Sequence, residues 1–150
     1  MRVLTTTFCV LALASACSRS ETASTTDHTV ALTPEEAGGE RVCGNAQVFF
    51  ASGSAELDEP SRERLDRYAS CLTSHEIDVI YVSGTTDPEG TPEANVALGR
   101  ERARAVADYL HDGGCHVDFV IRSLGENGAA QSEPLWPVDR AADVTAVSTR

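Results

Sequence analysis

The stretch of sequence that decides the fold is residues 77–110, which read IDVIYVSGTTDPEGTPEANVALGRERARAVADYL. Residues 77–82 form a nearly continuous apolar run, which is typical of a β-strand covered on both faces. A loop rich in turn residues follows. Thr91 can then cap a helix with Pro92 in its first turn, and this helix should run to Leu110. The stretch therefore predicts a strand, a loop and a long helix in succession.

Similar elements flank this unit on both sides. A short strand at 48–50 precedes a helix that Asp58 can cap, and the apolar residues of this helix recur at the spacing of one helix face. Further strands are predicted at 119–124 and, with a weaker pattern, at 144–147. Strands and helices that alternate in this way form crossover connections, so we expect one sheet with two main helices packed on it.

The second helix carries a charged residue where an apolar one is expected. On a helical wheel, Leu98 and Val106 lie on the apolar arc, and Arg102 falls between them. Burying an unpaired guanidinium costs several kcal/mol, so Arg102 needs an anionic partner.

The nearest candidate anion is Asp87, in the loop that leads into this helix. That loop follows the carboxyl end of a strand, which is where open sheets built from crossovers bind ligands. Two interpretations follow. Asp87 and Arg102 form a structural salt bridge that orients loop and helix, or they form a receptor for a zwitterion. In the receptor, Asp87 takes an ammonium group and Arg102 donates two parallel hydrogen bonds to a carboxylate.

The length, the net charge and the absence of enzyme motifs exclude several classes of function. The chain has 150 residues, which is room for one domain, and a formal charge of −11, which repels nucleic acid. The motifs of serine hydrolases, zinc proteases, P-loop and dinucleotide-binding enzymes do not occur, so we expect neither catalysis nor a cofactor. His111, Cys115 and His116 are close in sequence, but no fourth ligand has a spacing that suits a metal site.

The N-terminus has the pattern of an export signal. Residues 1–16 combine a positive start with an apolar run and predict a signal peptide. The small residues before Cys17 resemble the lipobox of bacterial lipoproteins, in which the cysteine receives acyl chains, although they also suit plain secretion. Residues 17–42 lack sustained periodicity, so we expect a lipidated N-terminus with a flexible linker there, followed by a domain at 43–150.

Export places the cysteines in a compartment that permits disulfides. Once Cys9 leaves with the signal peptide and Cys17 is lipidated, three cysteines remain, which allows one bridge and one spare thiol: Cys43, Cys71 and Cys115. If Cys17 stays free, four thiols allow three pairings.

The motifs around Asp87 and Arg102 resemble those of a known family. Gly84-Thr85-Thr86-Asp87, then Gly90, then Asn95-x-x-Leu98-x-x-x-Arg102-Ala103, are similar to the signature of the OmpA-like C-terminal domain, which peptidoglycan-associated lipoproteins share. Phe50-x-x-x-Ser54-Ala55-x-Leu57 and Leu124-Gly125-Glu126 extend the likeness, which covers roughly residues 43–148. The resemblance implies an α+β fold, a βαβαβ(β) sandwich in which two main helices pack on a mixed sheet.

The resemblance also implies a ligand. Members of this family bind peptidoglycan non-covalently through the diaminopimelate of the stem peptide. By position, Asp87 would hold the amino group and Arg102 the carboxylate, while Thr86 and Asn95 would shape the pocket. The chain would then be a lipoprotein at the periplasmic face of the outer membrane. Its lipid would hold the membrane, its domain would hold the cell wall, and envelope proteins of Tol–Pal type would be further partners.

The sequence departs from the family pattern at several positions. Thr85 stands where the family has His, Gly99 where it has Ser, and Ala142-Asp143 where it has paired arginines. The loss of two positive charges predicts weaker binding of a carboxylate. One alternative is therefore an OmpA-like interaction module of an envelope complex whose wall binding is weakened or lost. A peptidoglycan hydrolase is the other, and it predicts release of soluble muropeptides.

Family members with a similar cysteine pair imply a disulfide between Cys43 and Cys71. It would close a loop of about 29 residues and add on the order of 3 kcal/mol of stability. Cys115 occupies a position that is usually apolar, so we expect a buried thiol there.

Overall fold

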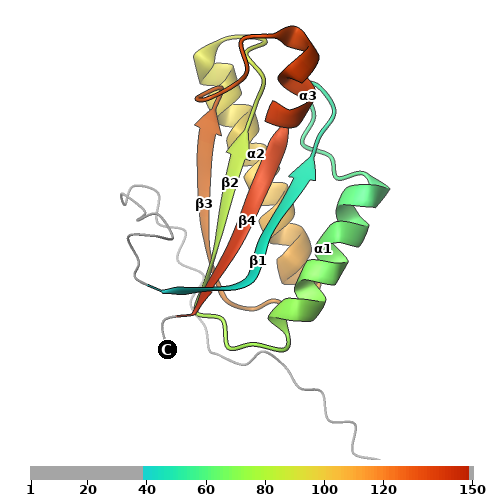
Figure 1. Cartoon of the computed structure of the whole chain (residues 1–150), viewed down its shortest axis with the longest axis vertical. Helices are drawn as coiled ribbons and strands as arrows, with labels where there is room; N and C mark the ends of the chain where they lie inside the picture. Colours follow the sequence, from blue (N-terminus) through green and yellow to red (C-terminus); the bar gives the residue numbers. More distant parts are fainter. Residues whose placement is uncertain (1–38, 149–150) are drawn as a thin grey trace, which may run out of the picture.

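The structure is a computed structural model that describes residues 39–148. The predicted signal peptide at 1–16, the predicted lipidation site at Cys17 and most of the predicted linker lie outside the described residues. No helix within the described range is long and apolar enough to span a bilayer. The elements in chain order are β1 (Glu40–Phe49), α1 (Glu59–Leu72), β2 (Val79–Thr85), α2 (Pro92–Asp112), β3 (Asp118–Gly125), the 3₁₀ helix η1 (Glu133–Leu135), α3 (Trp136–Asp139) and β4 (Ala141–Ser148) (Figure 1).

The four strands form one mixed sheet in the order β1-β4-β2-β3. β2 and β3 are parallel, whereas β4 lies between β1 and β2 and is antiparallel to both. The predicted α+β architecture, a mixed sheet with two main helices, is confirmed. β1 and β2 are not neighbours, because the last strand of the described chain inserts between them.

Both long helices pack on one face of the sheet, and Figure 1 shows α2 behind the strands. Leu65 of α1 and Val106 of α2 share this core with Ile80 and Val82 of β2. The other face, which we call the open face, carries no helix from the described residues. The side chains of residues 80–82 are nevertheless buried on both faces, as expected for this run. Ile80 and Val82 face the helices, and Tyr81, on the open face, is only 7% exposed.

The cross-strand register identifies the side chains of the open face. Gln47 of β1 pairs with Asp143 of β4, Asp143 pairs with Ser83 of β2, and Ser83 pairs with Arg122 of β3. Residues that are paired in register point to the same side of a sheet. A row of polar and charged side chains therefore crosses the open face.

The helix starts follow the predicted capping residues. The Asp58 side chain accepts a hydrogen bond from the Ser61 backbone N–H at 2.9 Å, and that of Thr91 accepts one from the Ala94 N–H at 3.2 Å. These bonds satisfy backbone donors that have no partner inside the helix. α2 ends at Asp112, two residues beyond the predicted Leu110.

β1 is longer than the predicted strand at 48–50. It begins at Glu40, so residues 40–42 belong to the sheet and not to the linker expected over 17–42. A bulge interrupts its pairing with β4 between Val42 and Asn45, where Cys43 and Gly44 both have a φ near +65°. Bulges bend a strand and re-aim its side chains. Figure 1 shows the resulting bend in β1.

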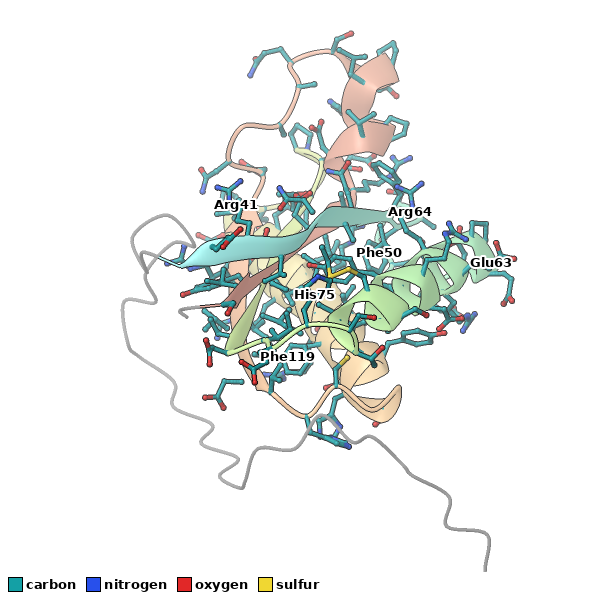
Figure 2. The ribbon with its side chains drawn as sticks, turned by 60° about the horizontal axis from the view of Figure 1, so that its bottom comes forward. Arg41, Phe50, Glu63, Arg64, His75 and Phe119 are labelled. Atoms are coloured by element: carbon teal, nitrogen blue, oxygen red, sulfur yellow. A yellow bond between two sulfur atoms is a disulfide. The ribbon has the colours of Figure 1, made fainter. Side chains whose placement is uncertain are left out.

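The bulge places Cys43 against the last turn of α1, where it forms the predicted disulfide with Cys71. Figure 2 shows the bridge next to His75, whose Nδ1 lies 3.7 Å from the Cys43 sulfur. Cys115 is 2% exposed and belongs to the core, which agrees with the predicted buried thiol. The disulfide therefore ties the edge strand β1 to the helix that covers it.

Two glycines let α2 approach the sheet closely. A Cβ built on Gly84 of β2 would lie 1.8 Å from the Gly99 carbonyl oxygen of α2. A Cβ built on Gly99 would lie 2.9 Å from the Gly84 carbonyl oxygen and 2.4 Å from the Ser123 hydroxyl. The helix and strand backbones are thus in direct contact just before the loop that carries Thr86 and Asp87.

Replacing Gly84 with alanine should destabilise the protein, because its Cβ would overlap a backbone atom that cannot rotate away. We expect Gly84→Ala to lower the free energy of unfolding by roughly 3 kcal/mol in urea denaturation followed by circular dichroism. Gly113→Ala is the control, because the backbone there has a φ of −72° and a Cβ would lie no closer than 3.3 Å to other atoms. Equal stability of both variants would contradict the direct contact.

Removal of the disulfide should lower stability through the entropy of the unfolded chain. We expect the double variant Cys43→Ser, Cys71→Ser to lose roughly 3 kcal/mol of unfolding free energy, which urea denaturation measures. Adding a reducing agent should destabilise the wild type by a similar amount and leave the double variant unchanged. If the reducing agent destabilises both equally, its effect has another origin.

Candidate functional site

The centre of the site is the buried side chain of Arg102, which is 0% exposed. Its Nε donates to the Ser54 carbonyl at 2.8 Å, and its two terminal nitrogens donate to the carbonyls of Thr85 at 2.7 Å and Ala51 at 3.0 Å. Three of the five N–H groups of the guanidinium are therefore used. Arg102 joins the loop after β1 to the end of β2.

The surroundings of Arg102 show how the buried charge is tolerated. The guanidinium carbon lies 5.3 Å from the centre of the Phe50 ring, a cation–π contact. Burial lowers the pKa of Arg102 to about 10, the Asp87 carboxylate partly offsets this, and the charge on Arg140 lowers the pKa further. The guanidinium is consequently still charged at neutral pH.

Asp87 makes its ion pair with Arg140 and not with Arg102. One carboxylate oxygen lies 3.3 Å from a terminal nitrogen of Arg140, and the other accepts a hydrogen bond from the Glu89 backbone N–H at 3.2 Å. Within the described residues, Asp87 and Arg102 form no salt bridge, so the structural bridge expected between them is absent. Backbone carbonyls satisfy Arg102 instead, and a helical wheel cannot reveal carbonyls from distant loops.

Arg140 is a site residue that the sequence analysis missed. It immediately precedes β4, and its carbonyl accepts the Phe50 N–H at 2.8 Å. Its side chain is 20% exposed, and its Nε is buried without a hydrogen-bond partner in the described part of the chain. The one available signal was its position as the single arginine just before the last strand.

Thr86 and Asn95, which the resemblance assigns to the pocket, are both buried. Thr86 is 1% exposed, its N–H donates to the Gly125 carbonyl at 2.9 Å, and its Oγ1 has no hydrogen-bond partner among residues 39–148. Asn95 is 3% exposed, and its side-chain amide donates to the Glu126 carboxylate. The structure therefore brings Thr86, Asp87 and Asn95 to the edge where β2 and β3 end.

The positions that depart from the family pattern have distinct surroundings. The Thr85 hydroxyl donates to the Ala141 carbonyl at 3.2 Å, and Gly99 makes the close contact with β2. Ala142 is 0% exposed and packs in the core. Asp143 points to the open face, where burial raises the pKa of its carboxyl group and a hydrogen bond with Gln47 partly offsets this.

One cluster has the residue types of a metal site. Cys43, Cys71 and His75 place their ligand atoms within 4.8 Å of one another, and they are the only such group of three in the described range. The disulfide uses both sulfurs, so His75 is the remaining donor. His111 and His116 pack their rings edge to face at 4.8 Å.

Comparison with known proteins identifies the family. Residues 49–141 match the OmpA family. This chain belongs to the OmpA family. Membership agrees with the prediction that the chain is not an enzyme.

Several known proteins are similar in sequence. The chain is 37% identical over 84 residues to the peptidoglycan-associated lipoprotein of Pasteurella multocida, a match that covers 55% of this chain and 56% of the relative. It is 38% identical over 63 residues to that of Haemophilus influenzae, with 42% and 41% covered. The matches thus span about half or less of these two relatives.

Solved structures support the same fold. The peptidoglycan-associated lipoprotein of Burkholderia pseudomallei superimposes with a TM-score of 0.61 at 32% identity, covering 67% of this chain and 88% of that one. The C-terminal domain of MotB from Helicobacter pylori has a TM-score of 0.60 at 16% identity, covering 69% and 84%, and therefore shares the fold alone.

Removing the guanidinium of Arg102 should leave three buried carbonyl oxygens without their donors. We expect Arg102→Met, which replaces the aliphatic part of the side chain and removes the guanidinium, to lower the free energy of unfolding by about 4 kcal/mol. Arg104→Met on the exposed side of the same helix should change it by less than about 0.5 kcal/mol. Urea denaturation of both variants measures this difference, and equal losses would contradict the structural role of Arg102.

Proposed function

We propose that this chain binds peptidoglycan non-covalently through the stem peptide and thereby anchors the envelope membrane to the cell wall. The observation that carries the proposal is the cluster of Asp87, Arg102 and Arg140 at one edge of an OmpA-family sheet. The similar proteins from Pasteurella multocida and Haemophilus influenzae are named as peptidoglycan-associated lipoproteins, which supports the same ligand here.

The charges of the cluster suit a zwitterion. Two arginines and one aspartate carry one surplus positive charge, which can receive a carboxylate. Asp87 keeps unused acceptor positions on its two oxygens for an ammonium group. The side-chain end of diaminopimelate carries both an ammonium group and a carboxylate, so we propose it as the group recognised.

The two arginines differ in what they can contact. Arg140 is partly exposed and has a buried Nε without a partner in the described chain, so a ligand carboxylate can reach it directly. Arg102 retains two N–H groups but is 0% exposed, so a carboxylate reaches it only when the segment at Ala51 or Thr85 shifts. In this proposal Arg102 positions the site and strengthens its positive potential, while Arg140 makes the first contact.

Thr86 and Asn95 complete the proposed pocket. The Thr86 hydroxyl is a buried polar group that a ligand could satisfy, and groups of this kind are costly when they have no partner. The hydrogen bond from Asn95 to Glu126 holds the start of α2 against the turn after β3. Together they would position the loop that carries Asp87.

The remaining parts of the proposal concern the cellular setting. We propose that residues 1–16 are a signal peptide, that Cys17 carries the lipid, and that the wall-binding domain predicted at 43–150 also includes residues 40–42 of β1. The chain would then lie at the periplasmic face of the outer membrane with envelope proteins of Tol–Pal type as further partners. The similarity to two peptidoglycan-associated lipoproteins supports an envelope location.

A second candidate is an OmpA-like interaction module with weakened or lost wall binding. The observation in its favour is that Ala142 and Asp143 replace the paired arginines of the family. Ala142 carries no charge, and Asp143 places a carboxylate on the open face next to the site. A carboxylate near an anionic ligand weakens binding by repulsion.

Sedimentation with purified sacculi tests the proposal. We expect the full chain to sediment with sacculi that contain diaminopimelate. Asp87→Asn and Arg140→Met should each weaken retention by roughly tenfold or more, because each removes a charged hydrogen bond to the ligand. The measurement is the bound fraction as a function of sacculus concentration.

Arg64→Ala is the matched control, since Arg64 is an exposed residue of α1 (Figure 2) and that helix contributes neither Asp87 nor Arg140. Equal retention of all variants would contradict the assigned residues, and no retention of the wild type would favour the interaction module. Calorimetry with a stem peptide that contains diaminopimelate, and with its lysine analogue, tests the carboxylate contact separately. The analogue lacks that carboxylate and should bind more weakly.

A further inference from the structure

A hollow lies on the open face of the sheet, at the edge where β2 ends. It has a volume of about 170 Å³, and neither Asp87 nor Arg102 lines it. The sheet contributes Gln47, Thr85 and Asp143 to its walls, and the connection between β3 and β4 contributes Asn127 and Asp139. Figure 1 shows this connection, with α3, beyond the same end of the sheet. The hollow is therefore a separate feature from the charged cluster.

The walls of the hollow are rich in hydrogen-bond acceptors. Asp143 and Asp139 contribute two carboxylates from different elements, and Gln47 adds an amide oxygen. One oxygen of Asp139 accepts the Ala130 N–H at 2.9 Å, and the other has no hydrogen bond recorded within residues 39–148. Carboxylates without a cation among their neighbours favour a ligand that supplies positive charge and donors.

The charge on Asp143 has no compensating cation in the described chain. Burial raises the pKa of its carboxyl group, the hydrogen bond with Gln47 opposes this, and no arginine contributes. Arg140 directs its guanidinium to Asp87, and Arg122 lies two strands away across Ser83. A half-buried carboxylate in this setting gains from any bound cation.

Thr86 gives an independent sign of a missing ligand. It lines the same hollow, it is 1% exposed, and its Oγ1 has no hydrogen-bond partner in the described range. Buried hydroxyl groups are paired in the large majority of cases, because an unpaired one costs on the order of 1–3 kcal/mol. A ligand in the hollow would supply the partner.

The residue types favour an organic cation over a metal ion. Ca²⁺ takes about six to eight oxygen ligands, commonly from several carboxylates, and the hollow offers two. Within residues 39–148, the only group of three side chains close enough to share a metal is the cluster at the disulfide. The volume corresponds to that of about six water molecules, which suits the end of an aminoalkyl chain.

We propose that this hollow binds a primary ammonium group, with Asp143 and Asp139 as its charged acceptors and Thr86 and Gln47 as its neutral ones. The ammonium group belongs to a peptide side chain or to a small amine. The proposal shares the Thr86 hydroxyl with the proposed wall-binding pocket. It uses none of the charged residues of that pocket, so it does not rest on the wall-binding function.

Nuclear magnetic resonance of the ¹⁵N-labelled full chain tests the proposal, with n-butylammonium chloride as the probe. We expect saturable shifts of the Thr86, Gly128 and Ala129 amide signals, and none with n-butanol in sodium chloride of equal ionic strength. Asp143→Asn keeps the shape and removes the charge, and should weaken binding about tenfold. Asp139→Asn should act in the same direction and serves as the second variant if Asp143→Asn does not fold.

Asp118→Asn is the matched control, because Asp118 is an exposed acid at the opposite end of β3. Its substitution should leave the titration unchanged. The proposal is overturned if no saturable shift occurs, or if neither Asp143→Asn nor Asp139→Asn weakens binding. It is also overturned if Ca²⁺ saturates the same signals at lower concentration than the amine, because the site would then be a metal site.

Sacculi identify the source of the ammonium group. If n-butylammonium competes with sacculi for the wild type and Asp143→Asn lowers retention, the wall peptide supplies the group. If retention is unchanged while the amine titration responds to Asp143→Asn, a small amine supplies it. If the wild type does not sediment with sacculi at all, the wall-binding proposal fails. The amine titration then still tests whether the hollow binds an ammonium group.

Discussion

The burial of one guanidinium group is the constraint on which the rest of this structure depends. Arg102 is fully enclosed, and three of its five N–H groups donate to backbone carbonyls of the loop after β1 and of the end of β2. Burying a cation without such partners would cost several kcal/mol, a large part of the net free energy of unfolding of a domain. The loop after β1 and the end of β2 are therefore held in one arrangement, and this arrangement positions the adjacent Thr86 and Asp87.

The close contact between Gly84 and Gly99 works together with this constraint. It brings α2 against β2 and so sets how deeply Arg102 lies beneath the loops. Asp87 is then free to pair with Arg140, a residue that arrives from the far end of the chain just before β4. The candidate site is thus assembled from separate segments of the chain around one buried charge.

The two binding proposals rest on a difference in charge between the helix side and the open face of the sheet, at the edge where β2 ends. On the helix side, two arginines and one aspartate leave a surplus of positive charge. On the open face, Asp139 and Asp143 present carboxylates around Thr86. The alternation of side chains along β4 directs Ala142 into the core on the helix side and Asp143 to the open face.

The sequence by itself determined the local elements and the unusual position of Arg102. Capping residues, apolar periodicity and turn residues act over a few residues, so Asp58, Thr91 and the arc around Arg102 could be read directly. The family motif also implied the disulfide, which the structure contains. Only the tertiary structure decided that backbone carbonyls accept the hydrogen bonds of Arg102 and that Arg140 pairs with Asp87. It also decided that, among the described residues, no helix covers one face of the sheet. Those outcomes depend on which distant segments meet when β4 inserts between β1 and β2, and no local pattern encodes that meeting.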